Sequence, residues 1–385
     1  MIQGAHRFPR QDTVVYGRPA AEVVIELAKR YGASRLMIMT TKSLLEAAQT
    51  LSADLGILSA GVFSDIAAHS PRTDVIAGAN AAREAKADLL VAFGGGSVID
   101  ATKVMQLCLW WAGIKQPEDL GPWRLGRGED RRDASAIQSG VRMIAIPTTL
   151  SAAEFTAVAG VTDGEKKVKE AYTHPDMAPK AVVLDPALTL TTPAKLWFST
   201  GLKAIDHAVE QLCNLQRAPM GDAVAAEGLR LLAEGLPACK ETPNDLEARA
   251  ICQHGMWLAI SGGASGRGMG ASHAIGHTLG GTYGVPHGIT SCITLHAVLE
   301  WNKNYGADRQ ALVAKLMGRR TLPASVVVRD LVIKLGLPWR LSEVLIGASH
   351  LRDIAEHTMH DRGIRTNPRP IRNADDIIQI LELAA

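Results

Sequence analysis

The sequence lacks any run of apolar residues long enough to cross a membrane. A membrane-spanning helix needs about 18 or more consecutive apolar residues, and no such run occurs in the 385-residue chain. The first ten residues, MIQGAHRFPR, also lack the apolar segment of a secretory signal. The first absence excludes a membrane-spanning protein, and the two together predict a soluble protein of the cytoplasm.

An excess of charge of either sign is absent as well. The 41 Lys and Arg residues are balanced by 39 Asp and Glu residues, which leaves a formal net charge of +2. Binding to nucleic acids or to membrane surfaces relies on clustered basic residues, and no long block of Lys or Arg occurs. We expect a small-molecule substrate and neither a nucleic-acid nor a membrane partner.

The cysteines are few and form no recognisable pair. Their number is five, and none belongs to a C-x-x-C motif of the kind that binds zinc or exchanges disulfides. This pattern argues against a disulfide framework and is typical of a reducing compartment. The cysteines are Cys108, Cys213, Cys239, Cys252 and Cys292.

The chain is long enough for two domains, because single hydrophobic cores stop growing at roughly 250 to 300 residues. Residues 1–190 alternate short β-rich runs with helical patterns, which predicts an α/β domain with an open parallel sheet that binds a nucleotide. Residues 191–385 show long helical periods and are expected to form an all-helical domain. We predict strands at 13–16, 35–39, 89–93 and 143–146, helices beginning at Ala20 and Leu44, a helix at 75–87, and a polar insertion at 126–139.

A glycine-rich turn between a predicted strand and a predicted helix is the clearest signal for a phosphate. The strand at 89–93 runs into Gly94, Gly95, Gly96 and Ser97. Glycines let backbone N–H groups approach phosphate oxygens, and a helix N-terminus offers unpaired donors and a positive dipole. The run is neither a G-x-G-x-x-G motif nor a P-loop, and a plain tight turn is the structural alternative. We predict that these residues bind the pyrophosphate of a dinucleotide.

Hydroxyl side chains follow two further predicted strands. Thr148, Thr149 and Ser151 come after the strand at 143–146, at the carboxyl end where open α/β sheets bind ligands; an ordinary helix N-cap is the alternative. Thr41 and Lys42 stand where dinucleotide enzymes usually place an acidic residue for the ribose 2′-hydroxyl. Without a carboxylate there, NADPH is acceptable as well as NADH, although Lys42 is equally typical of a solvated surface charge.

Histidines gather at helical spacing in the second half. His273 and His277 are spaced i, i+4, so their rings share one helical face, while His287 follows a proline at the expected start of the next element. Imidazole binds zinc and iron, and a catalytic metal site usually keeps three protein ligands and one open position. His207, His273 and His287 are therefore chemically sufficient for a metal. A buried ring bonded to the backbone is the alternative for any one of them.

A lysine complicates the metal hypothesis. Lys203 is spaced i, i+4 from His207 and shares its helical face. It opposes a divalent metal, because like charges at about 4 Å repel by about 4 kcal/mol near a protein surface. The structural alternative for Lys203 is an ion pair with Asp206 or Glu210 on its own helix.

Together these segments resemble the iron-containing (group III) alcohol dehydrogenase superfamily, and within it the maleylacetate reductase branch. The resemblance spans nearly the whole chain. It implies an N-terminal α/β domain that binds NAD(P), a C-terminal helical domain, hydride transfer in the cleft between them, and a homodimer. It also adds Asp100 to the residues expected at the cofactor. The matching landmarks are Gly94–Ser97 with Asp100 and Lys103, Pro147–Thr149 with Glu154, Asp185–Pro186, Thr200–Gly201 with His207 and Glu210, His273, His277, and Pro286–Gly288.

Carried over by position, the family's metal ligands fall on Lys203, His207, His273 and His287, and His277 falls on the histidine near the nicotinamide. The first position departs, because the metal-dependent members of the family have Asp where this chain has Lys203. Maleylacetate reductases also lack that Asp and work without a metal, and residues 147–156 match theirs in length. In contrast, Asp100 and residues 286–288 are more similar to the alcohol dehydrogenases.

We therefore expect NAD(P)H-dependent reduction of a carbonyl, in a maleylacetate-like keto acid, a ketone or an aldehyde, without a metal. Lys203, His207 and protonated His273 or His287 are expected to stabilise the developing alkoxide, and His277 to relay a proton. Three alternatives stay open. They are an iron- or zinc-dependent alcohol dehydrogenase that uses the three ligand histidines, a lyase of the dehydroquinate synthase type, and a non-catalytic nucleotide-binding protein.

Overall fold

The computed structural model describes residues 3–126, 130–166 and 168–385, which divide into two compact units. One unit comprises residues 8–191, and the other comprises residues 192–385 with the N-terminal residues up to Arg7. Part of the predicted polar insertion, residues 127–129, lies outside the described residues. Within the described ranges, no helix combines the length and the apolar character needed to cross a membrane.

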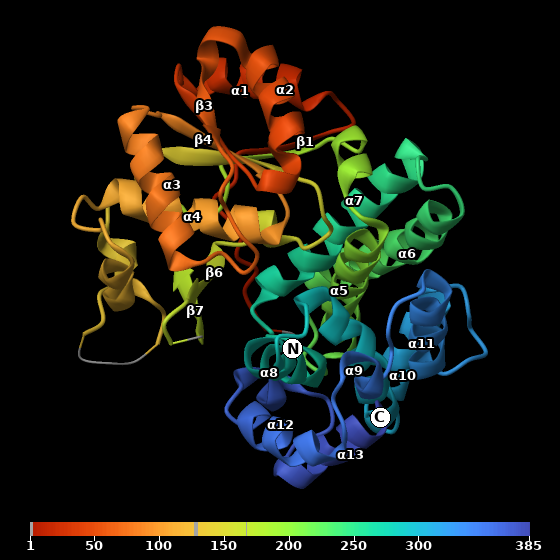
Figure 1. The fold of residues 1–385 in the computed structure, drawn as a ribbon. Helices are drawn as coiled ribbons and strands as arrows, with labels where there is room; N and C mark the ends of the chain where they lie inside the picture. The colour runs from red at the N-terminus through yellow and green to blue at the C-terminus, as the bar shows by residue number, and fades with distance from the viewer. Residues whose placement is uncertain (1–2, 127–129, 167) are drawn as a thin grey trace. The chain divides into compact units, whose positions relative to one another are not determined.

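The unit of residues 8–191 is built on a six-stranded sheet in which every pairing is parallel (Figure 1). Its strands are β1 (Thr13–Tyr16), β2 (Leu36–Met39), β3 (Ser59–Phe63), β4 (Leu89–Gly94), β5 (Arg142–Pro147) and β8 (Ala181–Leu184). The order across the sheet is β1-β8-β5-β4-β2-β3. A separate antiparallel hairpin joins β6 (Val158–Asp163) to β7 (Val168–Thr173). The helices of this unit are α1 (Ala20–Tyr31), α2 (Leu45–Leu55), α3 (Arg72–Glu84) and α4 (Gly96–Trp110).

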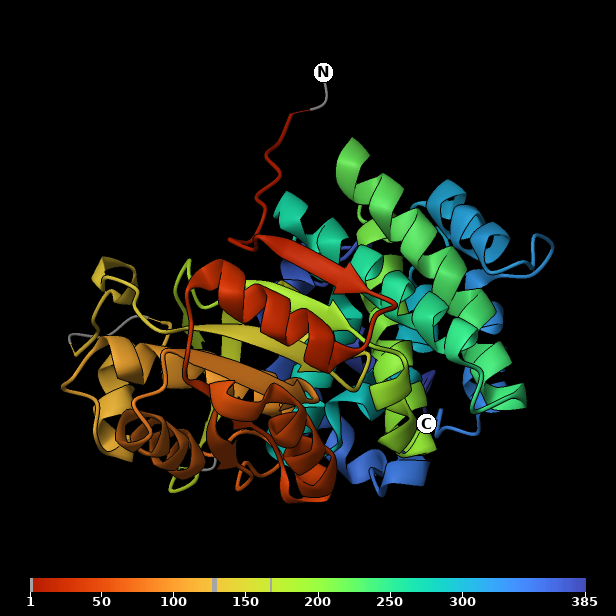
Figure 2. The same ribbon diagram turned by 90° about the horizontal axis from the view of Figure 1, so that it is seen from above.

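Helices cover both faces of this sheet, which explains why its inner strands are continuous apolar runs. One face packs on the apolar sides of α1 and α2, and Val24, Leu27 and Leu51 join a buried core with Ile38 and Phe93. In Figure 1, α1 and α2 lie on one side of the sheet and α3 and α4 on the other. Figure 2 shows the strands running side by side with α1 lying across them. The α/β class predicted from the sequence is confirmed.

The strand order reverses between β2 and β4. From β2 the chain moves outward to β3, then returns to β4 and continues in the other direction to β5. Open α/β sheets bind ligands outside the carboxyl ends of the strands at such a reversal. Here β2 ends at Met39 and β4 at Gly94, and Met39 pairs with Ala92. The fold therefore places the glycine-rich turn and the Thr41 segment at one edge of the sheet.

The second unit consists of helices and the segments that connect them, and its described residues contain no strand. Its helices are α5 (Ala194–Cys213), α6 (Pro219–Glu241), α7 (Leu246–Ser261), α8 (Ala271–Tyr283), α9 (His287–Trp301), α10 (Ala307–Leu316), α11 (Ala324–Leu335), α12 (Leu351–Thr358) and α13 (Ala374–Glu382). Helix α5 is central, because it is buried from Trp197 to Cys213 and contacts α6, α7, α8 and α9. The predicted helical domain is confirmed.

The backbones of α6 and α7 touch at a pair of glycines. A Cβ added to Gly228 would lie 2.5 Å from the nitrogen of Ala259 and 2.8 Å from the carbonyl oxygen of Gly255. A Cβ on Gly255 would meet the backbone nitrogen of Leu232 at 3.0 Å. Backbone atoms cannot rotate away as a side chain can, so the two helices must separate to admit a methyl group.

We predict that Gly228→Ala lowers the free energy of unfolding by about 1–3 kcal/mol, as overpacking usually does. Gly281→Ala is the matched control, because a Cβ there meets nothing within 4 Å. Alanine is favoured over glycine in a helix by roughly 0.5–1 kcal/mol, so the control is expected to be neutral or stabilising. Urea unfolding of both variants measures the difference, and equal effects would contradict the close packing of α6 on α7.

Candidate functional site

The glycine-rich turn has the geometry that only glycine readily adopts. Gly94 ends β4 with φ of +154°, and a Cβ there would lie 2.8 Å from Cγ2 of Val98. Gly95 is the N-cap of α4, and Gly96 is the first residue of that helix. The turn therefore brings a helix N-terminus directly to the end of a central strand, where its first backbone donors can meet an anion.

The predicted hydroxyl segment lies against this turn. The backbone N–H of Thr148 donates to the carbonyl oxygen of Gly94 at 3.0 Å. A Cβ added to Gly95 would lie 2.9 Å from Cγ2 of Thr149, and one added to Gly96 would lie 3.0 Å from Oγ of Ser151. The two segments, separated by about fifty residues in the sequence, thus form one surface.

Several polar atoms of this surface are buried and lack a hydrogen-bond partner among the described residues. They are Oγ1 of Thr149, Oγ of Ser151 and both carboxyl oxygens of Glu154. An unsatisfied buried polar group costs roughly 1–3 kcal/mol, so a cluster of them points to a ligand that supplies the missing bonds. Glu154 is a landmark of the family resemblance, but its place beside the predicted cofactor residues emerges only from the fold.

Two other predicted cofactor residues, Ser97 and Asp100, form hydrogen bonds within the α/β unit. Oγ of Ser97 accepts from the backbone N–H of His69 at 3.1 Å. Asp100 accepts from the backbone N–H of Gly160 at 3.0 Å, and its other oxygen lies 3.6 Å from Nζ of Lys103. Asp100 therefore joins α4 to β6, and its role at the cofactor stays a prediction.

The segment after β2 lies on the surface. Oγ1 of Thr41 lies 2.7 Å from Oγ of Ser43, within hydrogen-bond distance. Lys42 is exposed and pairs with exposed Asp65 at 3.3 Å. The solvated-charge interpretation of Lys42 thus has a structural basis, and the role of Thr41 at the cofactor stays a prediction.

Burial raises the pKa of Glu154 to about 7, and the charge of Asp100 adds to this effect, although Lys103 opposes it. A carboxyl whose pKa is higher in the folded than in the unfolded chain stabilises the fold below pH 4.5, and this contribution is lost as the pH rises through 7. We predict that Glu154→Gln gains about 3 kcal/mol of unfolding free energy relative to the parent between pH 4.5 and 8.

Urea unfolding at pH 4.5, 6 and 8 measures this relative gain, and Glu46→Gln on the exposed side of α2 is the control. A constant difference between Glu154→Gln and the parent across this range would show that Glu154 ionises as easily in the folded chain as in the unfolded one.

In the helical unit, the structure brings the four predicted histidines into a chain of ring contacts. The ring centroids of His207 and His273 are 5.0 Å apart, those of His273 and His277 are 6.4 Å apart, and those of His277 and His287 are 5.7 Å apart. Three helices, α5, α8 and α9, supply these side chains. The first and last pairs are stacked, with interplanar angles of 26° and 4°.

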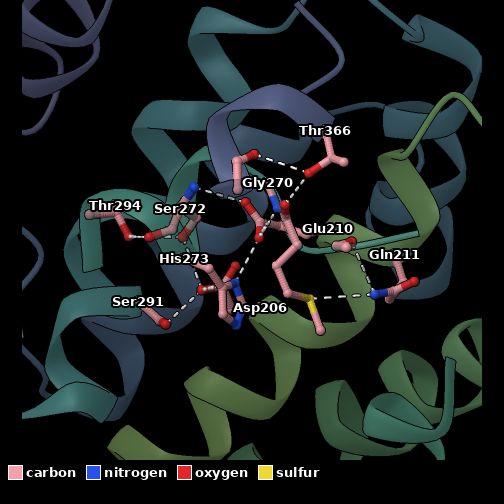
Figure 3. A network of polar contacts seen from close by, with 12 residues as sticks. Asp206, Glu210, Gln211, Gly270, Ser272, His273, Ser291, Thr294 and Thr366 are labelled. Carbon is pink, nitrogen blue, oxygen red and sulfur yellow. Dashed lines mark hydrogen bonds and ion pairs between the residues drawn. The ribbon is translucent and has the colours of Figure 1, made fainter. Parts of the chain in front are cut away.

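Glu210 fixes the start of α8 and the ring of His273 together (Figure 3). Its carboxyl oxygens accept from the backbone N–H of Gly270 at 2.7 Å and from that of Ser272 at 2.8 Å. Nδ1 of His273 lies 2.7 Å from the same carboxyl group. A carboxylate at a helix N-terminus satisfies donors that have no partner within the helix. Burial nevertheless raises the pKa of Glu210 to about 7, against the effect of these amides and of Lys203.

The two buried rings are neutral at physiological pH. Burial, together with the nearby charge of Lys203, lowers the pKa of His273 to about 3. Burial lowers the pKa of His207 well below its usual value, and His273 and Lys203 add to this. The expectation that a protonated His273 stabilises an alkoxide is therefore wrong, since it overlooked how deeply the ring is buried. Nε2 of His273 and Nδ1 of His207 are buried without a hydrogen-bond partner in the described ranges.

Lys203 is the cation of this cluster. Its side chain is 5% exposed, and its Nζ lies 3.8 Å from Oδ2 of Asp206, which is fully buried. This ion pair is the structural alternative to a catalytic Lys203. The ion pair and a catalytic role are compatible, because a buried ammonium needs a counter-charge whatever its function.

His277 has a carboxylate partner that no spacing indicated. Its Nδ1 lies 2.8 Å from Oδ2 of Asp361, 84 positions further along the chain. Oδ1 of Asp361 accepts from the backbone N–H of Gly363 at 2.7 Å, which holds the carboxylate in place. The side chain of His277 is about half exposed. Asp361 therefore orients a ring that solvent can reach, as a proton relay requires.

The donor set fits a divalent metal only in part. The unpartnered nitrogens of His207 and His273 are suitable ligands. The ammonium of Lys203 is not, because it has donors and no lone pair to offer a metal. Within the described part of the chain, the one group whose ligand atoms all lie within 4.8 Å of one another is Asp206, Glu210 and His273. Three of its carboxyl oxygens, both of Glu210 and Oδ2 of Asp206, accept from donors of the α8 and α9 segments, whereas Oδ1 of Asp206 has no hydrogen-bond partner among the described residues.

The fold and the site define a class of protein. A parallel α/β unit with a glycine-rich turn, and a helical unit with two buried histidines and one buried lysine, are features of an NAD(P)-dependent oxidoreductase. Residues 11–186 match the family model of the iron-containing alcohol dehydrogenases, and residues 197–385 match the model of the C-terminal part of that family. The chain belongs to the iron-containing alcohol dehydrogenase family.

Similar proteins include maleylacetate reductases. The enzyme of that name from Rhizobium sp. (strain MTP-10005) is 32% identical over 345 residues, covering 89% of this chain and 88% of the relative. Dehydrogenase FUM7 of Gibberella moniliformis is 32% identical over 409 residues, covering 97% and 96%. The crystal structure of maleylacetate reductase from Agrobacterium tumefaciens superposes with a TM-score of 0.84 at 29% identity, covering 100% of this chain and 98% of that one. The family and branch that the motifs resemble are confirmed. These matches favour an oxidoreductase over a lyase of the dehydroquinate synthase type.

Proposed function

We propose that this protein reduces the carbonyl group of a small molecule with hydride from NAD(P)H and without a metal. The observation that supports this proposal is a buried ammonium, Lys203, among rings that are neutral, His207 and His273. The names of the relatives suggest a keto acid of the maleylacetate type as the first substrate to test, followed by ketones and aldehydes.

The cofactor, held by the residues around Gly94–Ser97, would supply the hydride for the carbonyl carbon, so the site would need to stabilise negative charge on the carbonyl oxygen. Lys203 stabilises that charge, since a preorganised positive group in a dry site acts strongly there. His277, oriented by Asp361, passes a proton from solvent toward the alkoxide. The products are the alcohol and NAD(P)⁺, so one proton from solvent balances each hydride.

A second candidate is an iron- or zinc-dependent alcohol dehydrogenase that uses His207, His273 and His287. One observation favours it: Nδ1 of His273 faces Glu210 at 2.7 Å, which leaves Nε2 for another partner. Histidines that bind metals usually hold a carboxylate on the other ring nitrogen in this way. Lys203 opposes it, because a charged ammonium repels a dication.

The cofactor choice and the assembly are part of the same proposal. No carboxylate follows β2 at Thr41 or Lys42, so we expect both NADH and NADPH to be accepted. The homodimer is carried over from the family resemblance alone. Light scattering during gel filtration tests it.

The first experiment measures NADH and NADPH oxidation with maleylacetate and with a panel of ketones and aldehydes. The metal content of the purified protein is quantified before and after chelation. We expect turnover that survives chelation in protein with far less than one metal per chain. Activity that disappears with the metal and returns with iron or zinc would instead establish the second candidate.

We further predict that Lys203→Met lowers kcat by about 100-fold, which is typical for loss of one group that stabilises an oxyanion. Lys203→Arg keeps the charge and is the matched control, with a smaller expected loss. Affinity for NADH, measured by fluorescence, is expected to stay unchanged in both variants. A Lys203→Met enzyme with the kcat of the parent would reject the electrostatic role.

A further inference from the structure

The carboxylate of Asp206 and the hydroxyls of Ser272 and Ser291 converge from three different helices (Figure 3). Asp206 lies on α5, one turn beyond Lys203. Its Oδ2 accepts from Oγ of Ser272 on α8 at 2.9 Å and from Oγ of Ser291 on α9 at 2.6 Å. Asp206 is fully buried, and burial raises its pKa. A carboxylate in such a place persists only if its partners are fixed around it.

The distance from Lys203 to this carboxylate is informative. Nζ of Lys203 lies 3.8 Å from Oδ2 of Asp206, which exceeds the 2.7–3.2 Å of a direct hydrogen bond. A carboxylate oxygen has two lone pairs, and both serine hydroxyls donate to Oδ2, whereas Oδ1 has no hydrogen-bond partner among the described residues. The serines therefore hold Oδ2 of Asp206 near Lys203, at a distance that balances its charge without a direct hydrogen bond.

A tight pair would compromise the proposed catalysis. An ammonium bonded directly to a carboxylate has much of its field cancelled at the substrate, whereas an ammonium with no counter-charge is too costly to bury. The intermediate distance satisfies both demands. A further hydroxyl supports Ser272, because Oγ1 of Thr294 lies 2.8 Å from Oγ of Ser272.

We infer that Asp206, fixed by Ser272 and Ser291, is a positioning residue that keeps the ammonium of Lys203 in the site without neutralising it. This inference rests on the proposed function of Lys203. It goes further by assigning a role to three residues that touch neither substrate nor cofactor in the mechanism above.

A double-mutant cycle tests the inference. The variants are Lys203→Met, Asp206→Asn and the double variant, with kcat and KM measured on the panel substrate of highest turnover and unfolding free energy measured in urea. We expect Asp206→Asn to lower kcat at least 10-fold and to lose stability, because it removes a buried counter-charge of Lys203. The double variant is expected to recover stability toward the parent while its kcat stays as low as that of Lys203→Met.

The outcomes separate the two hypotheses. A Lys203→Met enzyme with parental kcat rejects the proposed function itself, and the inference with it. A low kcat in Lys203→Met with parental kcat in Asp206→Asn rejects the inference alone. A double variant that recovers kcat as well as stability also rejects it, since the pair would then be only structural.

Two further variants distinguish a specific effect on catalysis from a general loss of folding. Ser291→Ala removes one hydroxyl from Asp206 and is expected to lower kcat several-fold with unchanged affinity for NADH; parental kcat would overturn the inference. Asp222→Asn is the matched control, because Asp222 forms ion pairs with Arg267 at 2.6 Å and Arg309 at 3.3 Å in the same unit. It is expected to lose stability and to keep kcat. If it loses kcat as Asp206→Asn does, the kinetic effect follows from destabilisation, and the inference fails.

Discussion

The hydrogen bonds between Glu210 and the first amides of α8 are the contact on which the helical site depends. They join the central helix α5 to the start of the helix that carries His273 and His277. A Cβ on Gly270 would lie 2.8 Å from Oε1 of Glu210, so a larger residue at this N-cap would displace the Glu210 carboxyl group. The same carboxyl group sets the ring of His273. The position of α8 and the orientation of its first histidine are thus determined by one side chain.

Five buried side chains set the charge around this contact. Two buried carboxyl groups, Asp206 and Glu210, face one buried ammonium, and the two deepest rings are neutral. Each neutral ring keeps a nitrogen without a partner inside the described unit. Lys203 is consequently the one group among these five that carries a positive charge. A divalent ion in the same place would meet that charge at close range, which is why the metal and the lysine are alternatives.

Much of this site could be predicted because it follows helical spacing. Lys203, Asp206, His207 and Glu210 lie at i, i+3, i+4 and i+7 on α5, and periodicity alone places them on one face. The partners across the fold could not be predicted. Asp361 is 84 positions from His277, and Ser291 is 85 positions from Asp206. Only tertiary packing brings such residues together, and the same packing sets the burial that makes His273 neutral.

The strands of the sheet also differ in how far their sequences predict them. Three of the four predicted strands are the apolar runs β2, β4 and β5 inside the sheet, and the fourth, β1, is one edge. The other edge, β3, contains Gly61 and is only partly buried. A strand with one open side needs no continuous apolar run, so its sequence resembles a loop. Strand β8 is a buried run of four residues, as short as β1 and β2, and in β6 buried residues alternate with more exposed ones. Their identity is fixed by pairing partners that lie far away in the sequence.

Both units keep polar atoms in places where a protein without ligands gains nothing from them. In the α/β unit these are the hydroxyls of Thr149 and Ser151 and the carboxyl group of Glu154; in the helical unit they are ring nitrogens of His207 and His273. Each costs stability when it is left unpaired in a dry environment. The hydroxyls and the carboxyl group lie beside the glycine-rich turn, and the ring nitrogens lie beside Lys203. Since the unpaired atoms gather where the sequence motifs predict ligands, the stability that the fold gives up at each place is best explained as the preorganisation of a binding site.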